Sequence, residues 1–367
     1  MKKIFVVAGE QSGDRIAAWY ITKCQQRGDI LQATGIGGDA MVAAGVQLYD
    51  RYTQLNVIGL GELLRHLPCL YRYINRLVGH IVASNFDEIV LVDFPGFNLR
   101  LAKLLKRKQP SLRITYVSPP QLWVWGGWRV KRLQRDVDHV VVMYPFEVEW
   151  YAQRGVHAQW WGSPVYEAVA PFATGAAHKE LVVALIPGSR TSELATLVPL
   201  FLSVAADLKR KYPAAQFVLP VAQAMSKERL YALAAEHRQT AMLDGVTLVT
   251  GEADKFSALA RACVALTKPG TVTLELGLLQ VPSIVAFKTS ALTYVLAKQV
   301  VHVNAMALPN LLTGRPLFEE FIQGNCTREK LVAAMDAQIH QFLHDREAYE
   351  KRVKELAAVK DVLYYER

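Results

Sequence analysis

One pattern recurs along this chain and limits its fold more than any other feature: a short apolar run, a turn rich in glycine or proline, and a helical stretch. Near the start, IFVVA at 4–8 leads into the turn GEQSGD at 9–14, and EIVLVD at 88–93 repeats the arrangement. It returns with LVVALI at 181–186 and CVALT at 263–267. Short runs of Val, Ile and Leu that alternate with helices are typical of parallel strands buried on both faces. The sequence therefore predicts an α/β protein with doubly wound parallel sheets.

The repeats form two groups, separated by a looser stretch at 165–180 that we interpret as a linker. This spacing predicts two Rossmann-like domains that face each other across a cleft, residues 1–165 and residues 178–345. Ligands of such sheets bind at the carboxyl ends of the strands. The charged stretch 346–367 predicts a C-terminal helix, and packing back on the N-terminal domain is one arrangement we consider for it.

Composition and charge narrow the class of partner. The chain has 367 residues and a mean hydropathy of +0.13. It holds no uncharged apolar run of about 18 residues that could span a bilayer, and its first apolar run leads into a glycine turn rather than a cleavage site. Lys and Arg total 42 against 33 Asp and Glu, a formal charge of +9, which favours anionic partners: nucleic acid, anionic lipid or phosphorylated substrates. The four cysteines are far apart without a CxxC pair, so we expect buried free thiols in a reducing cytoplasm.

The turn at 268–271, KPGT, is the strongest candidate for a binding site. It follows a buried strand and opens a helix, where uncovered backbone N–H groups and the helix dipole favour a phosphate or diphosphate. Glu275 follows Thr271 by about one helical turn, on the same side, where its carboxylate could accept hydrogen bonds from a ribose. Most such turns bind nothing, but Gly270, Thr271 and Glu275 together describe a nucleotide seat.

A second turn, IPGSR at 186–190, repeats this logic. Gly188 and Ser189 follow a buried strand, and Arg190 adds a fixed positive charge with paired donors for a phosphate. An arginine in the first turn of a helix opposes the dipole, so its presence favours a bound anion.

Two turns in the first half carry polar groups. Asp93 follows four apolar residues, which predicts a partly desolvated carboxylate with a raised pKa that can accept a proton. A helix N-cap is the alternative for Asp93, although Asn98 is better placed for that role. The turn GEQSGD has no GxGxxG and no Walker lysine. It offers Ser12, Gly13 and Asp14 to an acceptor substrate, or it is a plain turn that binds nothing.

Two further segments have both a structural and a functional interpretation. In Val57–Val82, leucines three or four residues apart are mixed with arginines. This pattern predicts either a core-facing helix pair or a basic amphipathic surface that rests on a membrane or takes acyl chains. The aromatic run 118–125, followed by Trp128 and Arg129, is either a packed rim or a platform for a sugar or acyl chains. No HExxH or paired histidines indicate a metal site, and no GxSxG indicates an α/β-hydrolase.

Several motifs occur in a fixed order over most of the chain: AGEQSGD at 8–14, GIGGDAM at 35–41, DFPGFN at 93–98, YVSPPQLWVW at 116–125, PFEVEWY at 145–151, LIPGSRTSE at 185–193, GTVTLE at 270–275 and LPNLLTGR at 308–315. Together they resemble the lipid-A-disaccharide synthase family, membrane-associated glycosyltransferases of the GT-B fold. The resemblance implies that the N-terminal domain binds the acceptor and the C-terminal domain binds the UDP donor.

The resemblance also implies a reaction. The family transfers 2,3-diacylglucosamine from UDP to the 6-hydroxyl of 2,3-diacylglucosamine 1-phosphate, with inversion, and forms a β-1,6 bond without a metal or other cofactor. By this likeness Asp93 is the candidate base, and Asn310 matches a position near the donor. UDP would be held by seven residues: Gly188, Ser189, Arg190, Gly270, Thr271, Glu275 and Asn310. A cytoplasmic location at the inner face of the membrane is implied, with contact through Val57–Val82 and no nucleic-acid partner; a homodimer is left open.

Three places depart from the family pattern. Ser163 stands where the family usually has histidine, Lys268-Pro269 replaces a common serine, and Phe318-Glu319-Glu320 replaces Pro-Glu. The alternatives are a UDP-N-acetylglucosamine epimerase, another GT-B transferase with a soluble acceptor, or, from a different class, a basic membrane- or nucleic-acid-binding protein with an unused cleft.

Overall fold

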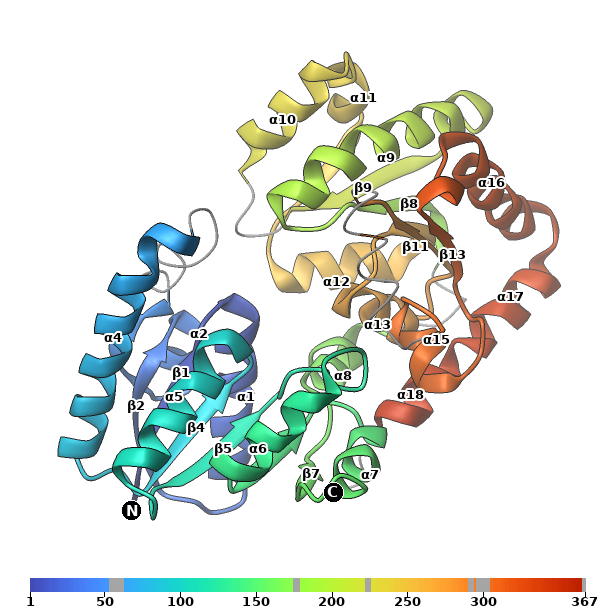
Figure 1. Cartoon of the computed structure of the whole chain (residues 1–367). Coiled ribbons are helices and arrows are strands. Elements are labelled where there is room, and N and C mark those ends of the chain that lie inside the picture. Colours follow the sequence, from blue (N-terminus) through green and yellow to red (C-terminus); the bar gives the residue numbers. More distant parts are fainter. Residues whose placement is uncertain (53–62, 174–178, 222–225, 290–293, 295–303, 365–367) are drawn as a thin grey trace. The chain divides into compact units, whose positions relative to one another are not determined.

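The computed structural model of the chain divides into two compact units, Met1–Pro164 and Val165–Arg367 (Figure 1). The structure describes all residues except 53–62, 174–178, 222–225, 290–293, 295–303 and 365–367. Each unit is a parallel sheet with helices on both faces, so the predicted doubly wound α/β fold is confirmed. That the two units face each other across a cleft stays a prediction.

The sheet of the first unit has the strand order β3-β2-β1-β4-β5-β6-β7. Its described strands are β1 (Lys2–Ala8), β2 (Leu31–Gly37), β3 (Gln47–Arg51), β4 (Glu88–Val92), β5 (Arg113–Val117), β6 (His139–Val142) and β7 (Ala158–Trp160). All pairings are parallel, so every carboxyl end lies at one edge of the sheet. All five residues of β4 are buried, as expected for a strand covered on both faces.

The helices of the first unit cover the two faces of this sheet. They are α1 (Gln11–Gln26), α2 (Asp39–Ala43), α4 (Leu63–Ala83), α5 (Pro95–Lys108), η1 (Gly127–Arg129), α6 (Val130–Asp136) and α7 (Phe146–Ala152). Phe5 and Val7 of β1 pack with α4 and α5, whereas Ile4 and Val6 pack with α1 on the other face. The alternation of side chains along one strand thus supplies two separate cores.

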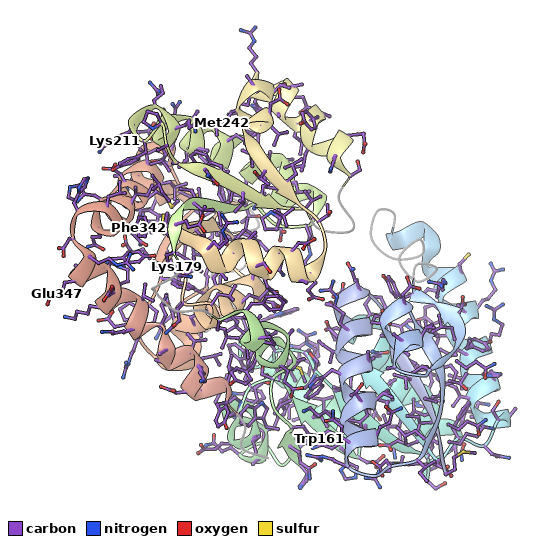
Figure 2. All side chains as sticks on the ribbon, turned by 180° about the vertical axis from the view of Figure 1, so that it is seen from behind. Trp161, Lys179, Lys211, Met242, Phe342 and Glu347 are labelled. Carbon is purple, nitrogen blue, oxygen red and sulfur yellow. The ribbon has the colours of Figure 1, made fainter. Side chains whose placement is uncertain are left out.

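The sheet of the second unit has the order β10-β9-β8-β11-β12-β13. Its described strands are β8 (Glu180–Ile186), β9 (Gln216–Pro220), β10 (Val246–Val249), β11 (Ala262–Thr267), β12 (Ser283–Phe287) and β13 (Glu319–Ile322). Its described helices are α8 (Pro164–Val169), η2 (Ala170–Phe172), α9 (Thr191–Lys211), α10 (Lys227–Glu236), α11 (Thr240–Asp244), α12 (Glu252–Arg261), α13 (Thr271–Leu278), α15 (Leu308–Thr313), η4 (Gln323–Asn325), α16 (Arg328–His344), α17 (Arg346–Glu355) and α18 (Ala357–Leu363). Buried Lys179, which is labelled in Figure 2, donates to the carbonyls of Ala260 and Leu279 and so ties the ends of α12 and α13 together.

Some local predictions were wrong. The first part of the expected linker is helical, as α8 and η2. The predicted C-terminal helix is two helices, α17 and α18, and α18 packs on α13 and α15 of the same unit; contact with the first unit stays a prediction. Cys69 is exposed, whereas the other three thiols are buried.

Helix α4 holds part of the segment expected at a membrane surface. Residues 53–62 and the side chains of 63–68 lie outside the described part of the chain. Further along α4, Tyr73, Ile74 and Leu77 are buried against the sheet, while Arg72 and Arg76 are exposed. No described helix is both long and apolar enough to cross a membrane.

Candidate functional site

The turn after β4 is held in an unusual backbone conformation. Asp93 and Phe94 have φ angles of +48° and +47°, a region that non-glycine residues seldom occupy. The Asp93 carbonyl accepts hydrogen bonds from the Tyr116 hydroxyl at 2.6 Å and from Asn98 Nδ2 at 2.8 Å. The Asp93 N–H donates to the carbonyl of Val117 at 3.1 Å. Such strain persists only where neighbours fix it, and it is concentrated at functional sites.

The Asp93 carboxylate lies beside buried phenols. Burial raises the pKa of Tyr116 and that of Tyr144. The negative charge of Asp93 adds to this increase for Tyr116, and the charges of Glu147 and then Asp93 add to it for Tyr144. A raised pKa of Asp93 itself stays a prediction. Asn98 as a helix cap was wrong: it lies inside α5, whose N-cap is Phe94, and its amide donates to the carbonyls of Val92 and Asp93.

The first turn of the chain serves mainly to hold a neighbouring helix. The carboxylate of Asp14 accepts three backbone hydrogen bonds at the start of α2, from Gly38 at 2.7 Å, Ala40 at 3.0 Å and Met41 at 3.2 Å. Asp14 is only 4% exposed. Its oxygens are therefore occupied by the protein, and its contribution to an acceptor site is to position the turn.

The rest of that turn lies against the Asp93 turn. A Cβ built on Gly9 would come within 2.3 Å of the Phe94 ring, so only glycine permits this approach. Gly13 is buried, while Ser12 is exposed and donates to Glu10 Oε1 at 2.8 Å. Since β1 and β4 are neighbours, the structure brings the predicted acceptor turn and Asp93 to one edge of the sheet.

The aromatic run after β5 is anchored at its base. Leu122 is 2% exposed, Trp123 Nε1 donates to Glu147 Oε1 at 2.8 Å, and the Tyr151 hydroxyl donates to the carbonyl of Pro120 at 3.1 Å. Burial raises the pKa of Glu147 to about 7. The packed-rim interpretation therefore holds for Leu122 and Trp123, and the run joins the same carboxyl edge as Asp93.

In the second unit, the turn after β8 already holds a carboxylate. Gly188 has a φ of +117°, and the N–H groups of Ser189 and Arg190 both donate to Glu193 Oε2 at 3.4 Å. Arg190 is the N-cap of α9 and Glu193 the third residue after it, the spacing of a capping box. Lys268 Nζ, from the turn after β11, lies 2.9 Å from Glu193 Oε1. The amides predicted to bind a phosphate thus carry an internal anion.

The KPGT turn is the neighbour of this one. Gly270 has a φ of +136°, and Thr271 at the start of α13 is exposed. Glu275 is mostly buried, and its Oε2 lies 2.7 Å from Lys255 Nζ. The Lys268 ammonium lies 3.5 Å from a Cβ built on Gly270, so this one cation stands beside both glycine turns.

Asn310 has its side-chain groups satisfied within the protein. Its Nδ2 donates to the carbonyl of Phe318 and to Glu320 Oε1, both at 2.8 Å, and its Oδ1 accepts from the Phe318 N–H at 2.9 Å. Glu320 in turn accepts from the N–H groups at the start of α15. Asn310 therefore fixes the loop between α15 and β13. Its partners Phe318 and Glu320 belong to one of the three places that depart from the family pattern.

Glu193 and Lys268 are the residues that sequence reasoning missed as a pair. The capping-box spacing of Arg190 and Glu193 was visible in the sequence. The ion pair was not, because its partners stand 75 positions apart.

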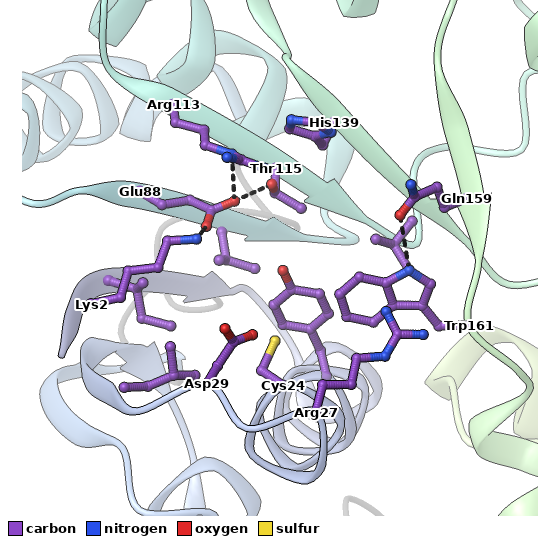
Figure 3. A pocket seen from close by; sticks show the side chains of 15 residues that line it. Lys2, Cys24, Arg27, Asp29, Glu88, Arg113, Thr115, His139, Gln159 and Trp161 are labelled. Atoms are coloured by element: carbon purple, nitrogen blue, oxygen red, sulfur yellow. Dashed lines mark hydrogen bonds and ion pairs between the residues drawn. The ribbon is translucent and has the colours of Figure 1, made fainter. Parts of the chain in front are cut away.

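A separate cavity of about 270 Å³ lies at the opposite, amino edge of the first sheet (Figure 3). Its wall includes Glu88, which accepts from the Thr115 hydroxyl and pairs with Lys2, and Trp161, which stacks on Tyr20 at 5.1 Å. None of the predicted site residues lines this cavity.

Comparison with known proteins gives one consistent result. The family model described as lipid-A-disaccharide synthetase matches residues 4–363. A lipid-A-disaccharide synthase from Geobacter metallireducens is 33% identical, covering 99% of this chain and 93% of that protein. Lipid-A-disaccharide synthase 1 from Legionella pneumophila (strain Paris) is 31% identical, covering 98% of this chain and 93% of that protein.

Solved structures resemble the fold. A putative UDP-N-acetylglucosamine 2-epimerase from Listeria monocytogenes has a TM-score of 0.61 at 12% identity, covering 99% of this chain and 95% of that one. Anabaena HepE in complex with UDP has a TM-score of 0.54 at 12% identity, covering 99% and 96%. At such identities the likeness concerns the two-domain α/β architecture alone.

Proposed function

The chain belongs to the lipid-A-disaccharide synthase family and is a glycosyltransferase of lipid A biosynthesis, and from this premise we propose the reaction that it catalyses. It transfers 2,3-diacylglucosamine from UDP to the 6-hydroxyl of 2,3-diacylglucosamine 1-phosphate, with inversion at the anomeric carbon. The products are a β-1,6-linked disaccharide and UDP. The protein works at the inner face of the cytoplasmic membrane, with contact through Val57–Val82.

The Asp93 turn is the observation that carries this proposal. Its strained backbone is fixed by Tyr116, Asn98 and Val117, at the edge of the sheet where ligands bind. The Asp93 carboxylate takes the proton of the acceptor hydroxyl while the oxygen of that hydroxyl forms a bond to the anomeric carbon. The bond from that carbon to the diphosphate oxygen breaks at the same time, and UDP leaves with the electron pair.

The donor is held by the second unit. The amides of Ser189, Arg190 and the Gly270–Thr271 turn, with the Arg190 guanidinium, stabilise the charge that gathers on the diphosphate. Glu275 accepts from the ribose, and Asn310 positions its loop. On the acceptor side, exposed Ser12 contacts the sugar, while buried Gly13 and Asp14 hold their turn.

The test is a product assay with the full chain, UDP-diacylglucosamine and the lipid acceptor. Asp93→Asn should lower kcat by about 10²- to 10⁴-fold, the usual contribution of a general base, and leave UDP affinity within a few-fold. Asp29→Asn, an exposed carboxylate at the amino edge, is the matched control and should keep full turnover. Disaccharide formation by Asp93→Asn at the normal rate would contradict the assigned base.

A UDP-N-acetylglucosamine epimerase is the second candidate, because solved structures of such epimerases have this fold. It would act on soluble UDP-N-acetylglucosamine. We expect no conversion of that sugar nucleotide by the chain. If the chain has no UDP affinity and its activity does not change with Arg190→Ala, the basic membrane- or nucleic-acid-binding class is indicated instead.

A further inference from the structure

Two tryptophans at the tip of the aromatic run are exposed and interleaved with arginines. Trp125 and Trp128 are 51% and 65% exposed, whereas the other tryptophans are half-buried. The Arg129 guanidinium lies 4.0 Å from the ring centre of Trp125 and 5.8 Å from that of Trp128. Arg132 lies 5.1 Å from the ring centre of Trp128. These four side chains, the tryptophan–arginine patch, combine apolar surface with two positive charges.

The exposure of this patch does not come from a loose loop. The base of the run is anchored by Leu122 and Trp123, and the Arg129 N–H donates to the Gly126 carbonyl at 2.9 Å. Gly126 has a φ of +74°, and a Cβ there would meet the Arg129 guanidinium at 2.6 Å. The turn therefore packs closely against the guanidinium while both indoles stay more than half exposed. Exposed apolar side chains that cluster in this way are typical of a binding surface.

The donors of the patch are not neutralised by carboxylates of the described residues. Among the described residues, Arg129 Nε is buried and has no hydrogen-bond partner. Burial lowers the pKa of Arg129, and the positive charge of Arg132 lowers it further. On the same helix as Arg132, Arg135 pairs with Asp136 at 2.6 Å. Two neighbouring guanidinium groups that repel each other are an arrangement that a shared anion stabilises.

The run that carries the patch begins at the same carboxyl edge of the sheet as the Asp93 turn. The run follows β5, which pairs directly with β4, and Val117 is the register partner of Val92. Tyr116 belongs to β5, the strand that leads into the run, and its hydroxyl donates to the Asp93 carbonyl. The strand that leads into the patch is thus hydrogen-bonded directly to the turn of the proposed base.

We propose that the tryptophan–arginine patch binds the phosphate of the acceptor through Arg129 and Arg132, and the apolar part of the same molecule through Trp125 and Trp128. The ligand class is a phosphate monoester on an acylated sugar. This inference rests on the proposed function and deepens it, because it assigns the residues that select a phosphorylated acceptor and orient its hydroxyl toward Asp93.

The test compares two acceptors in neutral detergent, diacylglucosamine 1-phosphate and its dephosphorylated form. Arg129→Gln and Arg132→Gln should each raise KM for the phosphorylated acceptor about tenfold or more, as expected for a lost charged hydrogen bond. The dephosphorylated acceptor should react as with the unaltered chain, and UDP affinity should not change. Arg154→Gln is the matched control, because Arg154 lies 4.0 Å from the ring centre of Trp150 at the far end of α7.

Other outcomes would overturn the inference. Equal losses on both acceptors would make the arginines structural. Unchanged KM values would make the patch a membrane contact if the variants also cosediment less than the unaltered chain with anionic vesicles and equally with neutral ones. If Arg129→Gln does not fold, exposed Arg132 decides the matter alone. Calorimetric binding of the phosphorylated acceptor separates the two proposals, because binding that depends on Arg132 without any disaccharide product would refute the proposed function and support the subsite.

Discussion

In each unit, a carboxylate near the first glycine turn accepts hydrogen bonds from backbone amides: Asp14 in the first unit and Glu193 in the second. The two carboxylates differ in how firmly they are held. Asp14 accepts three hydrogen bonds of 2.7–3.2 Å and is 4% exposed. Glu193 accepts two of 3.4 Å and pairs with Lys268, which shields it only partly from solvent. The first carboxylate is part of the fold, whereas the second occupies amides that a phosphate could take instead.

A carboxylate bound to backbone amides therefore has a different role in each unit. In the first unit the amides that Asp14 binds belong to a different helix, α2, so displacing the carboxylate would separate two elements. In the second unit Glu193 binds the turn of its own helix, and its release costs little structure. We expect the second turn to exchange its internal anion for the diphosphate of the donor.

Asp14→Asn should have the largest effect on stability. The amide nitrogen would face a backbone N–H of α2, which leaves buried donors unpaired, at a cost of about 2–4 kcal/mol. All seven tryptophans, Trp19, Trp123, Trp125, Trp128, Trp150, Trp160 and Trp161, belong to the first unit. Urea unfolding followed by tryptophan fluorescence therefore measures this unit. A variant as stable as the unaltered chain would break the comparison.

Arg190→Ala should have the second-largest effect, and it should change UDP binding but not stability. The side chain is 75% exposed and its Nη1 lies 3.8 Å from Glu193 Oε1, so its loss should leave stability within about 0.5 kcal/mol. UDP affinity should fall by about 10- to 100-fold, because a charged donor to the diphosphate is removed. Calorimetric titration with UDP measures this, with Arg261→Ala, an exposed pair with Glu180, as control.

The two units should also respond to pH with opposite signs. Burial raises the pKa of Glu147 in the first unit to about 7, and lowers that of Lys179 in the second unit to about 7. Between pH of about 4.5 and 7 the native first unit keeps a proton that the unfolded chain has lost, so its stability falls as pH rises. Between about 7 and 10.5 the unfolded chain holds a proton that native Lys179 lacks, so the second unit gains stability as pH rises.

Each slope is at most about 1.4 kcal/mol per pH unit. Urea unfolding at a series of pH values, followed by tryptophan fluorescence for the first unit and far-UV circular dichroism for both, measures them. Glu147→Gln should flatten the first slope and Lys179→Met the second. Slopes that survive these changes would show that other groups dominate.

These contrasts mark where sequence reasoning ends. The parallel strands and the glycine turns followed from periodicity, because a strand buried on both faces needs an unbroken apolar run. Whether a turn carboxylate faces a ligand or the protein did not follow. Asp14 is satisfied by Gly38 and Met41, more than twenty positions away, and no local pattern indicates that contact.

The same limit applies to the candidate site. The backbone strain at Asp93 and the inward turn of Asn98 depend on β5 lying beside β4, which the order of elements alone does not determine. The sequence did indicate that Trp125 and Trp128 were unusual, but their exposure and their arginine partners required the packed loop.

Glu193→Gln should have the smallest effect, and it tests the exchange directly. The change mirrors Asp14→Asn, carboxylate to amide, yet stability should stay within about 0.5 kcal/mol because the hydrogen bonds are long and the pair with Lys268 is partly solvated. Removing the internal anion frees Lys268 and two amides, so UDP should bind about three- to fivefold more tightly, with a steeper loss of affinity in salt. Weaker UDP binding would mean that Glu193 positions Lys268 for the donor, and the second carboxylate would then be as fixed as the first.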